Sequence, residues 1–162
     1  MPTLARQTNC CSHAARLAAF VLVALLGVGM GSAFSPLEED ARSFSMEVAA
    51  PYLKKGFKLR AEQWSGEIKY GEQTPVKFQL FKGNQYWFWA GSSDEKSTVS
   101  VNVYDTDGKS VASRKIRWKK GKGGVRVVPP VTGTYIVVIT IESKTEDNSG
   151  EKIGWALAYG YR

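Results

Sequence analysis

The sequence has only two cysteines and one histidine, and all three lie near its start, at positions 10, 11 and 13. From residue 14 onward neither a thiol nor an imidazole is available. Ser–His–Asp and Cys–His catalysis are therefore excluded for that part of the chain, and a zinc site would lack its usual nitrogen and sulfur ligands. Carboxylate chemistry remains open, but no spacing indicates the paired acids of a glycosidase. The sequence thus favours a binding protein over an enzyme.

The first 33 residues have the features of a secretory signal peptide. Arg6 and Arg16 supply positive charge, residues 17–28 (LAAFVLVALLGV) form an apolar run, and the small residues GSA end at Ala33. An uncleaved membrane anchor is the alternative, because the apolar stretch approaches the length that spans a bilayer. Cleavage would remove 33 of the 162 residues, leave no membrane span, and lower the net charge from +7 to +5. Such a mild charge indicates solubility and no nucleic-acid partner.

Export without cysteines is typical of a bacterial envelope protein, whereas small secreted eukaryotic domains usually depend on disulfides. We therefore expect an exported protein that is periplasmic, secreted or on the cell surface.

Residues 34–56 are expected to form a short helical segment. Ser35 and Glu38 form a capping box, with Pro36 at the first helical position. Apolar residues then recur on one helical face: Leu37, Ala41, Phe44 and Val48. Pro51 is expected to end or kink the helix. We interpret the apolar stripe as a face that packs against a sheet.

From residue 57 to residue 162 the apolar residues recur with a period of two, which is typical of strands with one buried face. Alternation is present at residues 57–61, 76–80, 99–103 and 125–127. Residues 134–141 (TYIVVITI) are apolar on both faces and are expected to form a central strand. Turn sequences at short intervals then predict an all-β fold, an antiparallel β-sandwich of about eight strands.

Two predicted strands have unusual faces. Residues 86–90 (YWFWA) carry Tyr86 and Phe88 on one face and Trp87 and Trp89 on the other. The last strand, residues 153–161 (IGWALAYGY), has one face made only of small residues: Gly154, Ala156, Ala158 and Gly160. We expect another element to pack closely there, either the N-terminal helix or the facing sheet.

The stretch VYDTDGKSV at residues 103–111 invites two interpretations. Asp105 and Asp107 are two apart, as in a calcium loop, but Gly108 and Lys109 do not fit the EF-hand template. Asp107-Gly108 is also a favoured dipeptide of tight hairpins, in which residues with positive φ are needed. We favour the hairpin, with calcium held by Asp105, Asp107 and an acid of another loop, such as Asp94 or Glu95, as the alternative.

Three motifs resemble the bacterial pre-peptidase C-terminal domain family. An aromatic strand follows a glycine turn at Gly83, a hairpin is built on Tyr104-Asp105-x-Asp107-Gly108, and a closing strand begins with Thr132-Gly133-Thr134-Tyr135. The resemblance covers roughly residues 75–142. It implies a jelly-roll-like β-sandwich that usually accompanies secreted hydrolases as a non-catalytic module, and some members bind calcium, polysaccharide or fibrous protein. This chain has no catalytic domain beside it, so no binding residue is transferred.

Basic side chains are concentrated in residues 113–126 (SRKIRWKKGKGGVR). They are Arg114, Lys115, Arg117, Lys119, Lys120, Lys122 and Arg126, with Trp118 among them. One interpretation is a site for a polyanion, such as an acidic glycan or an anionic envelope component. The other is a solvated strand edge that lysines protect from pairing with another strand.

Aromatic side chains provide a second candidate surface. Trp64, Trp87, Trp89 and Trp118 could form a platform on which sugar rings stack, because at least one of Trp87 and Trp89 could be exposed. The alternative is that they are core residues, since aromatics bury large areas.

Together these features predict an exported, non-catalytic binding module of the bacterial cell envelope that binds carbohydrate, as polysaccharide, or another polyanion. The candidate ligand-binding residues are Trp87, Trp89, Arg114, Arg117, Trp118, Lys119, Lys120 and Lys122. The alternative is a structural or protein-interaction subunit of an envelope assembly. No cofactor is expected, apart from the calcium alternative at Asp105 and Asp107.

Overall fold

A computed structural model describes residues 35–118, 120–144 and 150–162, with backbone alone at 113–118. They belong to a compact unit formed by residues 34–162. The predicted signal peptide lies outside the described residues. None of the described helices is long and apolar enough to cross a membrane.

The described part of the chain begins with helix α2 (Pro36–Leu53). The Ser35 hydroxyl accepts a hydrogen bond from the Glu38 backbone N–H at 3.3 Å, as the predicted N-cap requires. The helix does not end at Pro51 as one alternative had it, but continues to Leu53. It can do so because the N–H groups beyond the proline still find acceptors, with Lys54 donating to the Ala50 carbonyl at 3.3 Å.

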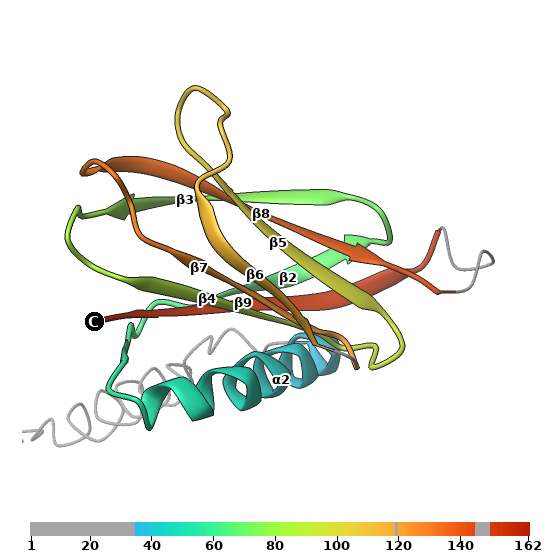
Figure 1. Ribbon diagram of the computed structural model, residues 1–162. Helices are drawn as coiled ribbons and strands as arrows, with labels where there is room; N and C mark the ends of the chain where they lie inside the picture. The colour runs from blue at the N-terminus through green and yellow to red at the C-terminus, as the bar shows by residue number, and fades with distance from the viewer. Residues whose placement is uncertain (1–34, 119, 145–149) are drawn as a thin grey trace, which may run out of the picture. The chain divides into compact units, whose positions relative to one another are not determined.

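Nine strands follow in the described part of the chain, in two antiparallel sheets (Figure 1). The larger sheet has the order β1-β9-β4-β7-β6, with β2 also paired to β9. Its strands are β1 (Lys58–Leu59), β2 (Trp64–Lys69), β4 (Tyr86–Ser92), β6 (Ala112–Trp118), β7 (Lys122–Val127) and β9 (Lys152–Tyr161). The smaller sheet has the order β3-β8-β5, with strands β3 (Gln73–Leu80), β8 (Gly133–Glu142) and β5 (Thr98–Tyr104).

The antiparallel β-sandwich predicted from the sequence is confirmed, as is the central position of the apolar strand β8. The main core fills the space between the sheets. It includes the inward faces of the strands, such as Phe88, Val103 and Ile139, all fully buried.

A second core lies on the outer face of the six-stranded sheet, beneath α2. It contains Val48 and Ala49 of the helix with Trp87, Trp89 and Ala158 of the sheet. Strands β4 and β9 are consequently buried on both faces. The small-residue face of β9 thus packs against the helix, which was one of the two alternatives.

Glycine permits this close approach of helix and sheet. A Cβ at Gly154 would collide with the backbone carbonyl of Leu37, and one at Gly91 with the carbonyl of Ala41. The axis of α2 lies along β4 and β9 in Figure 1. The helix therefore belongs to the folded unit as a third layer.

One predicted strand is shorter than expected, and one strand was not predicted. Alternation at residues 57–61 suggested a full strand, but β1 has only two residues, because Phe57 packs into the core beneath the helix. Strand β2 was not recognised, since its sequence WSGEIK lacks clear alternation.

Candidate functional site

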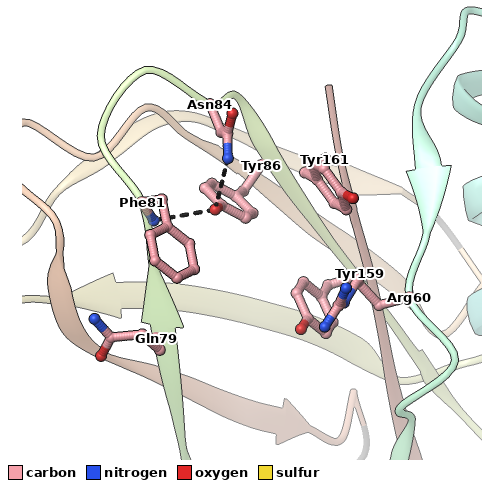
Figure 2. A pocket seen from close by; sticks show the side chains of 7 residues that line it. All are labelled: Arg60, Gln79, Phe81, Asn84, Tyr86, Tyr159 and Tyr161. Atoms are coloured by element: carbon pink, nitrogen blue, oxygen red, sulfur yellow. Dashed lines mark hydrogen bonds between the residues drawn. The ribbon is translucent and has the colours of Figure 1, made fainter.

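A pocket of about 210 Å³ opens at one end of the sandwich, where β3 ends, β4 begins and β9 ends. We call it the aromatic end pocket. Figure 2 shows its lining residues, which are Arg60, Gln79, Phe81, Asn84, Tyr86, Tyr159 and Tyr161. Aromatic rings and planar polar groups are thus brought together from three separate segments of the chain.

Strand pairing places the tyrosines. In the β4–β9 ladder Tyr86 lies opposite Tyr161, and Phe88 lies opposite Tyr159. Because side chains alternate along a strand, Tyr159 and Tyr161 project from the same face of β9. The rings of Tyr86 and Tyr161 have centroids 6.2 Å apart. The ladder therefore sets the spacing of the tyrosines along the pocket.

Tyr159, which lines the pocket, packs against other aromatic rings of the main core. Tyr159 is stacked on Phe88 with centroids 5.5 Å apart and planes 11° apart, and it meets Phe78 edge-on at 5.0 Å. Trp64 adds another edge contact to Phe78 at 4.5 Å. Each such pair contributes about 0.5–1.5 kcal/mol beyond its buried area. The floor is therefore rigid, and little ordering is needed when a ligand binds.

The hydroxyl of Tyr86 is held at the pocket wall. It accepts hydrogen bonds from the Phe81 backbone N–H at 3.0 Å and from the Asn84 side-chain amide at 3.2 Å. Both bonds are drawn in Figure 2. The hydroxyl hydrogen itself has no acceptor among the described residues, although Tyr86 is only 4% exposed.

Across the pocket from Tyr86 lies a cluster of three polar side chains: Tyr159, Glu62 and Arg60. Tyr159 donates its hydroxyl hydrogen to Glu62 Oε2 at 3.1 Å, and Arg60 lies 3.8 Å from the same carboxylate oxygen. Burial raises the pKa of the Tyr159 phenol above its ordinary value of 10.0, the Arg60 hydrogen bond lowers it, and the Glu62 hydrogen bond raises it again. The phenol is therefore neutral at physiological pH and serves as a hydrogen-bonding group.

Exposed apolar side chains lie on two loops that a hydrogen bond joins, and one of these loops contributes Phe81 to the pocket. Phe81 of the β3–β4 loop is 54% exposed, and the β7–β8 loop contributes Val128 and Val131 at 44% and 61%. The two loops are joined by a hydrogen bond from the Lys82 N–H to the Thr132 hydroxyl at 2.9 Å. The Phe81 ring is consequently available to a ligand that enters the pocket.

The expectation that Trp87 or Trp89 is exposed is wrong. Trp87 is 4% exposed and Trp89 is fully buried. Tyr52 of α2 covers both, with ring centroids 4.4 Å and 5.7 Å away. The helix uses this tryptophan face as its docking surface, so neither ring can stack on a sugar. Trp64 is partly buried against the main core.

The basic segment is only partly described. The side chains of Arg114, Arg117, Trp118 and Lys119 lie outside the described residues, so their role stays a prediction. Lys120 is exposed, in the β6–β7 turn. Lys122 is committed to a structural contact, since its Nζ lies 2.6 Å from Glu47 Oε2 and 4.9 Å from the centre of the Phe44 ring. It ties α2 to β7.

Residues 105–108 form a turn, as favoured above. Asp105 Oδ1 accepts the backbone N–H groups of Asp107 at 3.1 Å and Lys109 at 2.8 Å. Of the two central residues expected to have positive φ, Gly108 alone does, at 76°. The Gly108 N–H donates to the Asp105 carbonyl and the Asp105 N–H to the Lys109 carbonyl, which is a three-residue loop closed by a glycine bulge.

Among the described residues there is no group of three acidic side chains placed to hold a metal ion. Asp94, the acid considered as a calcium partner, accepts the Tyr70 hydroxyl at 2.9 Å and the Lys96 N–H at 2.8 Å.

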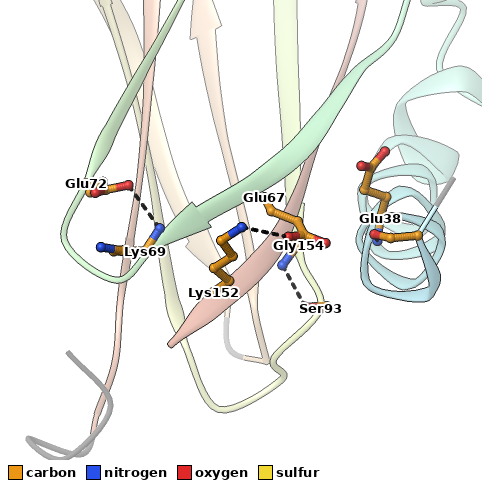
Figure 3. Close-up of polar contacts among 8 residues, drawn as sticks. Glu38, Glu67, Lys69, Glu72, Ser93, Lys152 and Gly154 are labelled. Atoms are coloured by element: carbon orange, nitrogen blue, oxygen red, sulfur yellow. Dashed lines mark hydrogen bonds and ion pairs between the residues drawn. The ribbon is translucent and has the colours of Figure 1, made fainter. Parts of the chain in front are cut away.

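Carboxylates elsewhere also have structural partners. Figure 3 shows Lys152 of β9 beside Glu67 of β2, at 3.7 Å, and Glu72 accepting the Lys69 N–H at 3.1 Å. A wider groove of about 590 Å³ beside α2 has one carboxylate, that of Glu38, among its described lining residues, and this carboxylate accepts the Ser65 hydroxyl at 3.0 Å.

The residues of the aromatic end pocket were missed at the sequence level. The sequence signal that could have found the pocket was the aromatic residue at the start of β4, Tyr86, and the one at the end of β9, Tyr161. A prediction that these two strands pair would have placed the two rings together. Arg60 and Gln79 carry no motif, because the pocket is assembled by tertiary contacts.

No family model matches this chain, so the resemblance to the pre-peptidase C-terminal domain stays a prediction. No curated protein matches it either. Among solved structures it is similar to Aeromonas hydrophila PliG, a periplasmic lysozyme inhibitor of g-type lysozyme, with 16% identity over 67% of this chain and 90% of that one and a TM-score of 0.45. A de novo designed double-stranded β-helix matches with 12% identity over 61% of this chain and 99% of that one, with a TM-score of 0.33. Both TM-scores lie below 0.5, so these likenesses carry no inference about what the chain binds.

Proposed function

We propose that this protein is an exported, non-catalytic binding module of the bacterial envelope, and that a saccharide binds in the aromatic end pocket. The observation that carries the proposal is that the exposed ring of Phe81 and the half-buried ring of Tyr161 line one pocket, which also presents Gln79, Asn84 and Arg60. Ring faces suit the apolar face of a sugar, and planar amide and guanidinium groups suit its oxygen atoms.

The volume agrees with this class of ligand. About 210 Å³ accommodates one sugar ring, and the open side allows a chain to continue into solvent. The stacked floor of Phe88 and Tyr159 supports preorganised binding.

Saturation-transfer NMR and isothermal titration with soluble oligosaccharides test the proposal. Phe81→Ala and Tyr161→Ala are expected to weaken binding about tenfold, which corresponds to the ~1.4 kcal/mol of a ring contact. Val131→Ala is the matched control, because this residue is exposed and apolar but does not line the pocket. Absence of saccharide binding at millimolar concentration, or equal losses in the control, would refute the assignment.

A protein-interaction role is the second candidate. Phe81, Val128 and Val131 are exposed on neighbouring loops, and clustered apolar residues are typical of protein contacts. Cross-linking in envelope extract, followed by purification of the stoichiometric partner, would distinguish this role. Val131→Ala would then weaken the complex while leaving saccharide binding unchanged.

A further inference from the structure

We infer that the aromatic end pocket selects a saccharide that carries a carboxylate, such as a uronic acid. This inference rests on the proposed function and adds the chemical class of its ligand. It follows from which hydrogen-bonding groups of the pocket are already committed and which are still available.

Tyr86 provides the first available donor. Its oxygen already accepts two hydrogen bonds, from Phe81 and Asn84, so its remaining capacity is its own O–H. Because Tyr86 is 4% exposed, an acceptor on the ligand would satisfy this hydrogen where solvent has little access.

Gln79 and Asn84 are only partly used. The Oε1 atom of Gln79 accepts the Thr134 hydroxyl at 3.4 Å, which leaves one lone pair of Oε1 and the NH₂ group. The Nδ2 atom of Asn84 donates to Tyr86 at 3.2 Å, which leaves its second hydrogen and the Oδ1 atom. Each amide therefore still offers both a donor and an acceptor.

Arg60 adds donors to the pocket and no acceptor. A guanidinium has five N–H donors and no acceptor. Its ion pair with Glu62 is long, at 3.8 Å, and both side chains are about half exposed, at 47% and 59%. Such a pair is weak. Arg60 also hydrogen-bonds to Tyr159, and the rest of its five N–H donors are available to an acceptor on the ligand. Glu62 keeps its hydrogen bond from Tyr159 at 3.1 Å.

The excess of donors favours an acid over a neutral sugar. The two amides each offer both a hydrogen and an oxygen, whereas Tyr86 and Arg60 offer hydrogens only. Each sugar hydroxyl brings a hydrogen that needs an acceptor, but a carboxylate brings acceptors only. Arginine also binds carboxylate in a two-pronged geometry that other side chains do not match.

Titration of the full-length protein with trigalacturonate and with its methyl ester tests the inference, because the two ligands differ only in the acid groups. The acid is expected to bind at least tenfold more tightly at 150 mM salt. Arg60→Gln should abolish this preference, and it should weaken binding of the acid at least tenfold more than binding of the ester. Tyr86→Phe should reduce the preference several-fold. Lys82→Gln is the control, since Lys82 is an exposed cation on the same loop as Phe81 but does not line the pocket.

The outcomes are distinguishable. Equal binding of acid and ester refutes the carboxylate inference and leaves the proposed saccharide site standing. A preference that survives Arg60→Gln, or that Lys82→Gln removes equally, indicates general attraction to a basic surface and also refutes it. If neither ligand binds, and neutral oligosaccharides fail as well, the proposed function itself is wrong. Arg60 is exposed, so an unchanged unfolding midpoint of Arg60→Gln confirms that the comparison concerns binding alone.

Discussion

The contact between α2 and the six-stranded sheet allows a sharp prediction at Gly91. A Cβ added there would collide with the Ala41 carbonyl and would lie 2.7 Å from the Ser45 backbone N and 3.0 Å from the Phe44 Cβ. The Ser45 nitrogen would have to retreat by roughly 0.8 Å to reach ordinary van der Waals contact. Two of these three atoms belong to the helix backbone, so a rotamer change cannot relieve the clash.

We expect Gly91→Ala to destabilise the protein by about 1–3 kcal/mol, the usual cost of overpacking a well-packed core. Alanine also restricts the unfolded chain more than glycine does, which offsets about 0.5–1 kcal/mol. Gly133→Ala is the matched control, because Gly133 is also in a strand, yet a Cβ there meets nothing within 4 Å. The control should be as stable as the wild type or slightly more stable.

Urea unfolding followed by circular dichroism and by tryptophan fluorescence measures the difference between the two variants. Fluorescence reports on this contact directly, because Trp87 and Trp89 lie beneath α2. A free energy of unfolding for Gly91→Ala within about 0.5 kcal/mol of that for Gly133→Ala would refute the close packing of helix on sheet.

Three further predictions concern single side chains. Because the folded-state pKa of Tyr159 is raised, the folded protein holds the phenol proton more tightly than the unfolded chain does. The contribution of Tyr159 to stability is therefore fully present below pH 10 and is lost as the pH rises from 10 through the folded-state pKa. Tyr159→Phe should flatten this alkaline loss in thermal melts at pH 9 to 11, and an identical slope in both proteins would contradict the assignment. Asp105→Ala removes an acceptor of two backbone N–H groups and should cost about 1 kcal/mol in urea unfolding, whereas added calcium should leave the wild-type melting temperature unchanged. Lys122→Met removes the ion pair with Glu47 and should lower the free energy of unfolding by about 1 kcal/mol; the loss is this small because Glu47 is 65% exposed. A double-mutant cycle with Glu47→Gln that gives no coupling energy would exclude a stabilising ion pair between α2 and β7.

Local sequence signals were sufficient wherever neighbouring residues decide the structure. The cap at Ser35, the turn at Asp105 and Gly108, and the central position of β8 depend on residues close in sequence or on a strand's own apolar pattern. For the same reason the sandwich class could be predicted, since repeated alternation and short turns require two layers to bury the apolar faces.

Tertiary structure decided where the aromatic side chains lie. The sequence placed Trp87 and Trp89 on the opposite face from Phe88, which is confirmed, but periodicity cannot reveal that a helix covers that face. The aromatic end pocket was likewise invisible, because Arg60, Phe81 and Tyr159 are far apart in the chain and meet only when β9 pairs with both β1 and β4. Sequence alone therefore determined which faces are apolar, whereas the packing of distant segments determined which rings remain open to a ligand.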